Sequence, residues 1–443
     1  MNRSILIGTV LILLGFFLNI TAKASSLNIN PKRIIVKLKN GKDIPALKGI
    51  NKSVYFFETT YVLYTNGDES LLNKLRSHQD VQDAQFDTFS KREPLPTPVE
   101  AIESESVEEG DEIYSSVLND PKLSKLWAFK DASKHGMSVN KVYEESGLAI
   151  SNEPVIVAVV DTGVDYNHED LKDVMWTNIN EIPGNGIDDD GNGYIDDIHG
   201  INTLERDSDG NATGDMMDGH SHGTHVSGTI AATQNNGVGI AGVASNVRIM
   251  GLRSVPSYGD ETDVDIAESF LYAARNGAKV INCSFGKSHN EGGMLVKETI
   301  DYIAKTYNTL VVVSAGNSSQ NIDTKLTYPA SYDSEGMLVV ASSTRYGRFS
   351  YFSNYGFVSV DVAAPGSSIY STTPGNRYGN MSGTSMASPN TTGVAAEVLS
   401  RHPYLTAVEL KNVLMNSVTT KSSMDGDILT GGVVDLYSAL ESL

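Results

Sequence analysis

The chain has 443 residues, of which 40% are hydrophobic and 20% charged, a composition typical of a globular protein of two or three domains. Its single Cys excludes an internal disulfide and a zinc site built from cysteines. The formal net charge of −20 argues against a nucleic-acid partner, because neutralising phosphates needs a basic face.

The N-terminal segment, residues 1–24, has the pattern of a signal peptide. A basic start precedes an apolar stretch from Ile5 to Ile20, and Ala22 and Ala24 then supply small residues where a signal peptidase reads. We predict cleavage after Ala24 and export, so that the protein is secreted or periplasmic. A retained anchor is the alternative, but the apolar stretch is shorter than the about 20 residues that span a bilayer. No stable membrane association is expected.

Residues 25–92 predict a small α+β domain. Apolar alternation within 34–38, 54–57 and 61–64 indicates three strands, and a helix beginning at Asp68 would place leucines on one face. This part of the chain is basic, with 11 Lys and Arg against 7 Asp and Glu, a net of +4.

A linker is predicted over residues 93–118. Residues 93–112 contain three Pro, eight acidic residues and no Lys or Arg. Such a composition cannot bury enough apolar surface to fold, and it suits an exposed segment that a protease can cut.

Residues 119–443 predict one long α/β domain. A continuous apolar run such as 155–160 is typical of a parallel strand covered on both faces. Further strands and helices then alternate, with strands over 280–285 and 310–314 and helices over 266–276 and 296–305. We therefore expect a parallel sheet flanked by helices on both faces.

Three residues with catalytic chemistry fall at the ends of predicted elements. Asp161 ends the first apolar run, His222 opens a helix of small residues, and Ser385 lies at a strand-to-helix turn. A serine hydroxyl becomes a nucleophile when a neutral imidazole takes its proton, and a carboxylate orients that imidazole. Each residue alone could be a turn former, a structural His or a helix cap. Together they fit the acid, the base and the nucleophile, in the chain order Asp, His, Ser.

The motifs around these residues resemble the subtilisin-like serine peptidases, the subtilase family. They stand in the family's order within residues 119–443 and read VVDTGVD, HGTHVSGT, VINCSFG, VVVSAGN, YPASY, FSNYG, VAAPG and GTSMASPN. The resemblance implies a triad of Asp161, His222 and Ser385. It also implies that residues 25–92 are a propeptide, which acts as a folding chaperone and temporary inhibitor. A permanent N-terminal domain is the alternative for that segment.

The resemblance further implies an oxyanion hole and a substrate-binding edge. Asn317 would donate its amide to the oxyanion together with the backbone N–H of Ser385; without the rest of the constellation, a turn Asn after Gly316 would be the alternative. The backbone of Ser284, Phe285 and Gly286 would pair with an extended peptide, or these residues could be an ordinary strand end. Thr327 would lie near the base of the first specificity pocket. A pocket without a carboxylate there would favour a medium apolar residue before the cleaved bond.

An acidic insertion separates Asp161 from His222. Residues 161–218 carry 2 basic and 16 acidic residues, a net of −14. Within it, Asp188, Asp190, Asn192 and Asp196 fit ligand positions one, three, five and nine of an EF-hand-like calcium loop.

Position twelve of this loop is His199 instead of Glu, so either another acid such as Asp197 or Asp207 closes the loop or the loop binds calcium weakly. Independently, Asp170 matches a calcium ligand of the family that pairs with the loop around Asn235 and Asn236. A merely solvated acidic loop is the alternative to structural calcium.

The function expected from these patterns is that of a secreted serine endopeptidase, made as an autoprocessed zymogen, that hydrolyses polypeptides through an acyl-enzyme. Its partners would be polypeptide substrates and its own propeptide. The alternatives are a maturation peptidase for one partner protein and a catalytically silent binding protein on the same scaffold.

Overall fold

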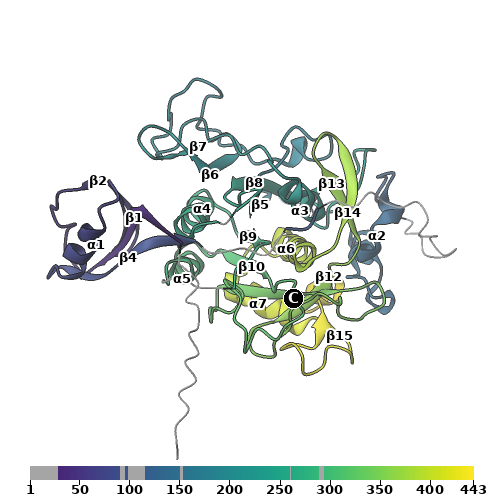
Figure 1. Cartoon of the computed structure of the whole chain (residues 1–443). Helices are drawn as coiled ribbons and strands as arrows, with labels where there is room; N and C mark the ends of the chain where they lie inside the picture. The colour runs from purple at the N-terminus through teal and green to yellow at the C-terminus, as the bar shows by residue number, and fades with distance from the viewer. Residues whose placement is uncertain (1–27, 90–94, 98–114, 150–152, 260, 289–293) are drawn as a thin grey trace, which may run out of the picture.

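The computed structural model describes residues 28–89, 95–97, 115–149, 153–259, 261–288 and 294–443. The predicted signal peptide and most of the predicted linker lie outside these residues. Figure 1 shows two units in the described part of the chain. One is a small N-terminal unit, and the other is a larger unit in which helices surround a central sheet. No described helix has the length and hydropathy needed to cross a membrane.

The N-terminal unit is a four-stranded antiparallel sheet with one helix, in the strand order β2-β3-β1-β4. The three predicted strands and the helix form, and Asp68 caps the helix by accepting a hydrogen bond from Ser70 N–H. A fourth strand, β4, completes the sheet; its polar sequence VQDAQFDTF gives no clear alternation. The elements are β1 Asn28–Leu38, β2 Ile50–Phe57, β3 Thr60–Thr65, α1 Glu69–Arg76 and β4 Val81–Phe89.

The larger unit is built on a ten-stranded sheet in the order β15-β16-β12-β11-β10-β9-β5-β8-β6-β7. The strands from β16 to β6 are paired in parallel, as predicted, and only the edge strands β15 and β7 run antiparallel. The strands are β5 Val155–Asp161, β6 Gly200–Arg206, β7 Ala212–Thr213, β8 Val247–Arg253, β9 Val280–Cys283, β10 Leu310–Ser314, β11 Met337–Ser343, β12 Val362–Pro365, β15 Thr419–Thr420 and β16 Gly432–Val433. A separate hairpin consists of β13 Ile369–Thr373 and β14 Arg377–Met381.

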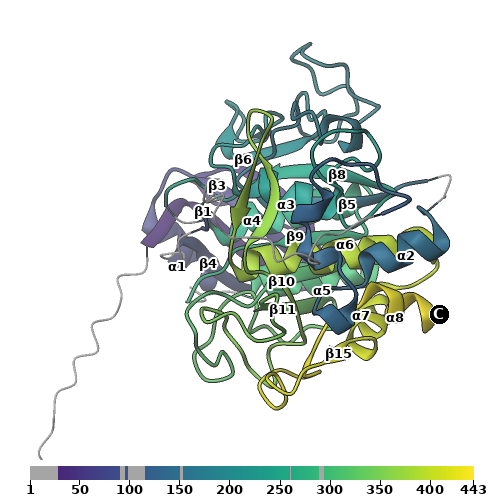
Figure 2. The same ribbon diagram turned by 90° about the vertical axis from the view of Figure 1, so that its right-hand side faces the viewer.

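Helices cover both faces of this sheet (Figures 1 and 2). Within β5, Val157 and Val159 pack in the core with α3 and α6, while Ala158 and Val160 pack in the core with α4 and α5. Burial on both faces is why the strand needs a continuous apolar run. The helices are α2 Val139–Ser146, α3 His222–Ala231, α4 Asp263–Arg275, α5 Leu295–Tyr307, α6 Thr384–Arg401, α7 Ala407–Asn416 and α8 Leu436–Glu441.

The N-terminal sheet packs against α4 and α5 (Figure 1). The rings of Phe57 and Tyr302 stack with centroids 5.0 Å apart. At the centre of the contact, Arg33 of β1 lies 2.8 Å from Asp87 of β4 and 2.6 Å from Asp265 of α4. Lys37 makes a further ion pair with Glu298 of α5, so opposite charges meet across this interface.

Candidate active site

Asp161 and His222 form a buried pair at the carboxyl edge of the sheet. Asp161 is the last residue of β5, which runs between β8 and β9, and His222 is the first residue of α3. The Nδ1 atom of His222 lies 2.8 Å from Oδ1 and 3.0 Å from Oδ2 of Asp161. A carboxylate in this place favours the imidazole tautomer that carries its proton on Nδ1.

Gly223 allows this close approach. A Cβ atom on Gly223 would lie 2.1 Å from the carbonyl oxygen of Gly163 and 3.1 Å from Cβ of Asp161. A larger residue would therefore push the start of α3 away from Asp161.

Ser385 lies in the first turn of α6, which packs against α3. Its hydroxyl donates to the carbonyl oxygen of Ser284 (2.9 Å), and the Ser284 hydroxyl donates to the carbonyl oxygen of Ser385 (3.0 Å). The Nε2 atom of His222 is buried and, within the described residues, has no hydrogen-bond partner. An acceptor for the serine proton is thus present, and catalytic hydrogen bonds often tighten only when substrate binds.

Asn317 is held beside the start of α6. Its Oδ1 accepts hydrogen bonds from the backbone N–H (2.8 Å) and the hydroxyl (3.0 Å) of Thr384. Its Nδ2 lies 3.6 Å from the position that a Cβ would take on Gly383. The amide of Asn317 is therefore close to the backbone that leads into Ser385.

Comparison with known proteins identifies the family of this chain. The model of the subtilase family matches residues 152–431, more than half of the chain. The chain belongs to the subtilase family.

Two similar relatives are the subtilisin-like protease 1 of Plasmodium berghei, 33% identical over 368 residues, and the thermitase of Thermoactinomyces vulgaris, 35% identical over 285 residues. The first match covers 77% of this chain and 60% of the relative; the second covers 64% and 88%. This subtilase thus spans about three fifths of the length of the Plasmodium protein. Among solved structures, a similar one is fervidolysin from Fervidobacterium pennivorans, which is described as a keratinolytic enzyme related to subtilisin. Its TM-score is 0.70 at 26% sequence identity, and the match covers 94% of this chain and 62% of the fervidolysin chain.

The predicted substrate edge of this subtilase lies directly after β9. Ser284 and Phe285 are buried, and the Phe285 side chain belongs to the core, which leaves only its backbone for pairing. A Cβ on Gly286 would lie 3.4 Å from the Thr327 methyl, and one on Gly316 would lie 3.5 Å from it. The buried Thr327 therefore places its methyl group near both glycines.

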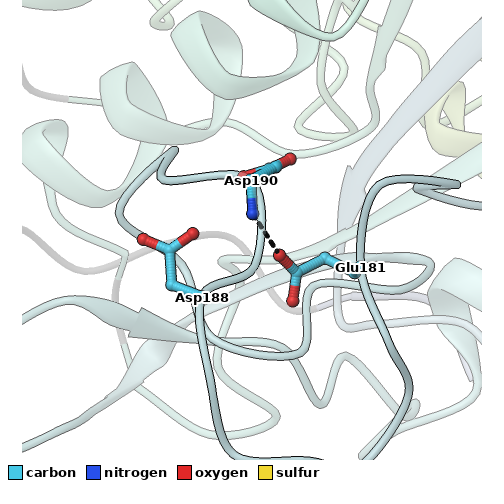
Figure 3. Close-up of side chains that lie close together, drawn as sticks. All are labelled: Glu181, Asp188 and Asp190. Atoms are coloured by element: carbon cyan, nitrogen blue, oxygen red, sulfur yellow. Dashed lines mark hydrogen bonds between the residues drawn. The ribbon is translucent and has the colours of Figure 1, made fainter.

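The acidic insertion brings three carboxylates together: Glu181, Asp188 and Asp190 each have an oxygen within 4.8 Å of the others (Figure 3). Glu181 also accepts hydrogen bonds from the backbone N–H groups of Asp189 (2.8 Å) and Asp190 (3.2 Å). Glu181 precedes the EF-hand-like pattern, so that pattern could not identify it. An oxygen-rich cluster of this kind suits a hard divalent cation.

The remaining predicted ligands of the loop are arranged differently. Asn192 Nδ2 donates to Asp190 (3.1 Å) and to the buried Asp197 (3.0 Å). Burial raises the pKa of Asp197 to about 6. Asp196 instead accepts hydrogen bonds from the backbone N–H groups of Asn185 and Gly186. The structure therefore brings Glu181, and not Asp196, to Asp188 and Asp190.

Asp170 holds the loop that follows α3. It accepts hydrogen bonds from Asn236 Nδ2 (2.8 Å) and from the backbone N–H of Ile240 (2.9 Å). Asp120, which the sequence analysis did not single out, accepts one from the backbone N–H of Asn235 (3.1 Å). Burial raises the pKa of both carboxyls, and among the described atoms Oδ1 of Asp120 has no hydrogen-bond partner.

Proposed function

We propose that this subtilase is a secreted serine endopeptidase that hydrolyses polypeptides through an Asp161–His222–Ser385 triad and an acyl-enzyme. The observation that carries the proposal is the buried His222, oriented by Asp161 at 2.8 Å, with its other nitrogen available beside the helix that bears Ser385. Export by the segment 1–24 belongs to the same proposal.

The mechanism follows from these groups. The hydroxyl of Ser385 leaves the carbonyl of Ser284, transfers its proton to Nε2 of His222 and attacks the peptide carbonyl. Asn317 Nδ2 and the Ser385 backbone N–H, at the positive end of α6, stabilise the oxyanion. The protonated His222 then donates to the leaving amine, and water repeats the sequence to release the acyl group.

A peptide library tests this function against its alternatives. We expect cleavage of many sequences, mostly after medium apolar residues because of the Thr327 methyl, and complete loss of cleavage after treatment with a serine-directed phosphonate. Cleavage of one sequence alone would favour a maturation peptidase. No cleavage, with binding retained, would favour the silent binding protein.

We further propose that residues 25–92 are a propeptide and that the chain is processed within about residues 92–120, with the mature chain starting near Asn119. Supporting contacts occur at the start of the linker: Pro96 Cγ lies 2.9 Å from the Cβ position of Gly383, two residues before Ser385. The linker at Pro96, within the proposed processing window, therefore lies beside the backbone that leads into Ser385. Near the other end of that window, the Asn119 N–H donates to Oδ1 of Asn235 in the larger unit.

Inhibition by the separated propeptide is expected to weaken as pH rises. Burial, together with the neighbouring Asp265 and Asp263, raises the pKa of Asp87 to about 7 in the docked state, although Arg33 opposes the shift. The carboxyl group of a solvated Asp has a pKa near 4. Between about pH 4 and pH 7, the docked propeptide therefore binds a proton on Asp87 that the free propeptide does not bind. Docking is therefore strongest at low pH and is weakened progressively until the pH passes about 7.

The measurement is the inhibition constant of added propeptide at pH 5.5 and pH 8.5, where we expect at least about a tenfold difference. Asp87→Asn should remove most of this pH dependence of the inhibition constant. Asp43→Asn, at an exposed site in the same unit, should leave the pH dependence unchanged. Tighter inhibition at pH 8.5 would contradict the prediction.

We also propose that calcium binds at two places: at Asp188 and Asp190 with Glu181, and at Asp170 with Asp120. The residues fit a hard cation, because close carboxylates repel one another and a buried carboxylate is costly unless a positive charge compensates it. Bound there, calcium would tie the insertion and the loop after α3 to the domain.

Removal of calcium should destabilise the fold and accelerate autolysis. A ligand at a hundredfold excess over its Kd stabilises by about 2.7 kcal/mol, which corresponds to about 5 °C in Tm for a domain of this size. The double variant Asp188→Asn/Asp190→Asn should lose part of this calcium dependence in a thermal melt. The control Asp173→Asn/Asp209→Asn removes two exposed charges of the same segment and should keep it. A Tm indifferent to calcium and chelator would exclude the sites.

A further inference from the structure

Asp218, four residues before His222, receives hydrogen bonds from the segment that leads into α3. Its Oδ1 accepts from the backbone N–H groups of His220 (2.8 Å) and Ser221 (3.0 Å). Its Oδ2 accepts from the backbone N–H (3.0 Å) and the hydroxyl (2.5 Å) of Thr224. One carboxylate thus contacts residues on both sides of His222.

The same carboxylate is connected to the segment after Asp161. The buried hydroxyl of Thr162 donates to Oδ1 of Asp218 (2.8 Å) and accepts from the backbone N–H of Gly223 (3.1 Å). The backbone N–H of Asp165 donates to the Thr224 hydroxyl (3.0 Å). Asp218 therefore joins the residue next to the catalytic acid to the residues next to the catalytic base.

The backbone before His222 needs such support. Ser221 has a φ of 115°, an unfavourable conformation for a residue with a side chain, and within the described residues its side chain makes no capping hydrogen bond to α3. The first N–H groups of a helix need acceptors, and a negative charge there is favoured by the helix dipole. The Asp218 carboxylate meets both needs.

We propose that Asp218 is a positioning residue, which holds the imidazole of His222 against Asp161 and toward Ser385. The proposal rests on the proposed function, because it assigns a role within that triad. Displacement of a catalytic group by about 1 Å can cost on the order of 100-fold in rate, even when the change lies outside the reacting atoms.

The test is Asp218→Asn, which keeps the shape of the side chain but replaces one acceptor oxygen with a donor that faces N–H and O–H donors. Each zymogen is processed with a trace of wild-type enzyme, and active sites are counted with a phosphonate. We expect kcat to fall about 10- to 100-fold with KM within about twofold of wild type. We also expect the acidic limb of the pH profile of kcat to move to lower pH, because the hydrogen-bond network on both sides of His222 loses a negative charge.

Matched variants keep the test decisive. Asp215 is an exposed residue in the same loop, and its carboxylate accepts hydrogen bonds from the Met217 N–H and the Tyr166 hydroxyl, so Asp215→Asn should leave kcat and the pH profile unchanged. If Asp218→Asn does not fold, Thr162→Val carries the test, because it removes the hydrogen bonds of the Thr162 hydroxyl with Asp218 and with the Gly223 N–H. It should lower kcat about tenfold, and Thr162→Ser, which keeps the hydroxyl, should restore kcat.

A processed Asp218→Asn enzyme with a lower Tm but wild-type kcat and pH profile would overturn the inference and leave the proposed function intact. The same holds for Thr162→Val if that variant carries the test. A wild-type chain that hydrolyses no peptide would overturn both.

Discussion

Replacing Ser385 by Ala is expected to reduce kcat on the order of 10⁶-fold, the loss typical when a serine nucleophile of a triad is removed. The remaining side chain has no hydroxyl to attack the carbonyl, and His222 then has no proton to accept. Labelling by a serine-directed phosphonate should disappear, and the precursor should accumulate at full length because processing uses the same site.

Ser382→Ala is the matched control, since Ser382 is exposed, lies three residues earlier and accepts a hydrogen bond from the Ser368 N–H. It should leave labelling and processing unchanged. Mass spectrometry that locates the phosphonate on a residue other than Ser385 would refute the assignment of the nucleophile.

Replacing Asn317 is expected to lower kcat on the order of 100- to 1000-fold with little change in KM, because the oxyanion forms only as the carbonyl is attacked. Two variants separate the amide donor from the packing role. Asn317→Ala removes both the donor and the Oδ1 that accepts from Thr384. Asn317→Asp keeps an acceptor for Thr384 but places a carboxylate where the oxyanion would form.

The Asp variant should therefore be at least as slow as the Ala variant, although its fold is the better preserved. Stopped-time assays with one peptide, normalised to titrated active sites, measure both. An Asn317→Asp enzyme with near wild-type kcat would mean that Asn317 has only the turn role.

The Asp, His and Ser motifs could be located from the sequence because each lies within a single short element. The apolar run that ends in Asp161 needs burial on both faces, and the small residues after His222 let α3 lie against the sheet and α6. The helix at Asp68 could be predicted for the same reason, since its cap and its leucines are neighbours in the chain. Strand β4 could not, because its register depends on pairing with the distant β1.

The sequence by itself thus determined the family, the parallel α/β architecture and the three candidate catalytic residues, because local periodicity and short motifs encode them. Tertiary structure alone decided which carboxylates meet. Glu181 joins Asp188 and Asp190 while Asp196 turns to backbone N–H groups, Asp120 reaches the loop beside Asp170, and Asp218 links both sides of the triad pair. Such contacts join loops whose ends are placed by the packing of distant strands and helices, and no spacing along the chain records that placement.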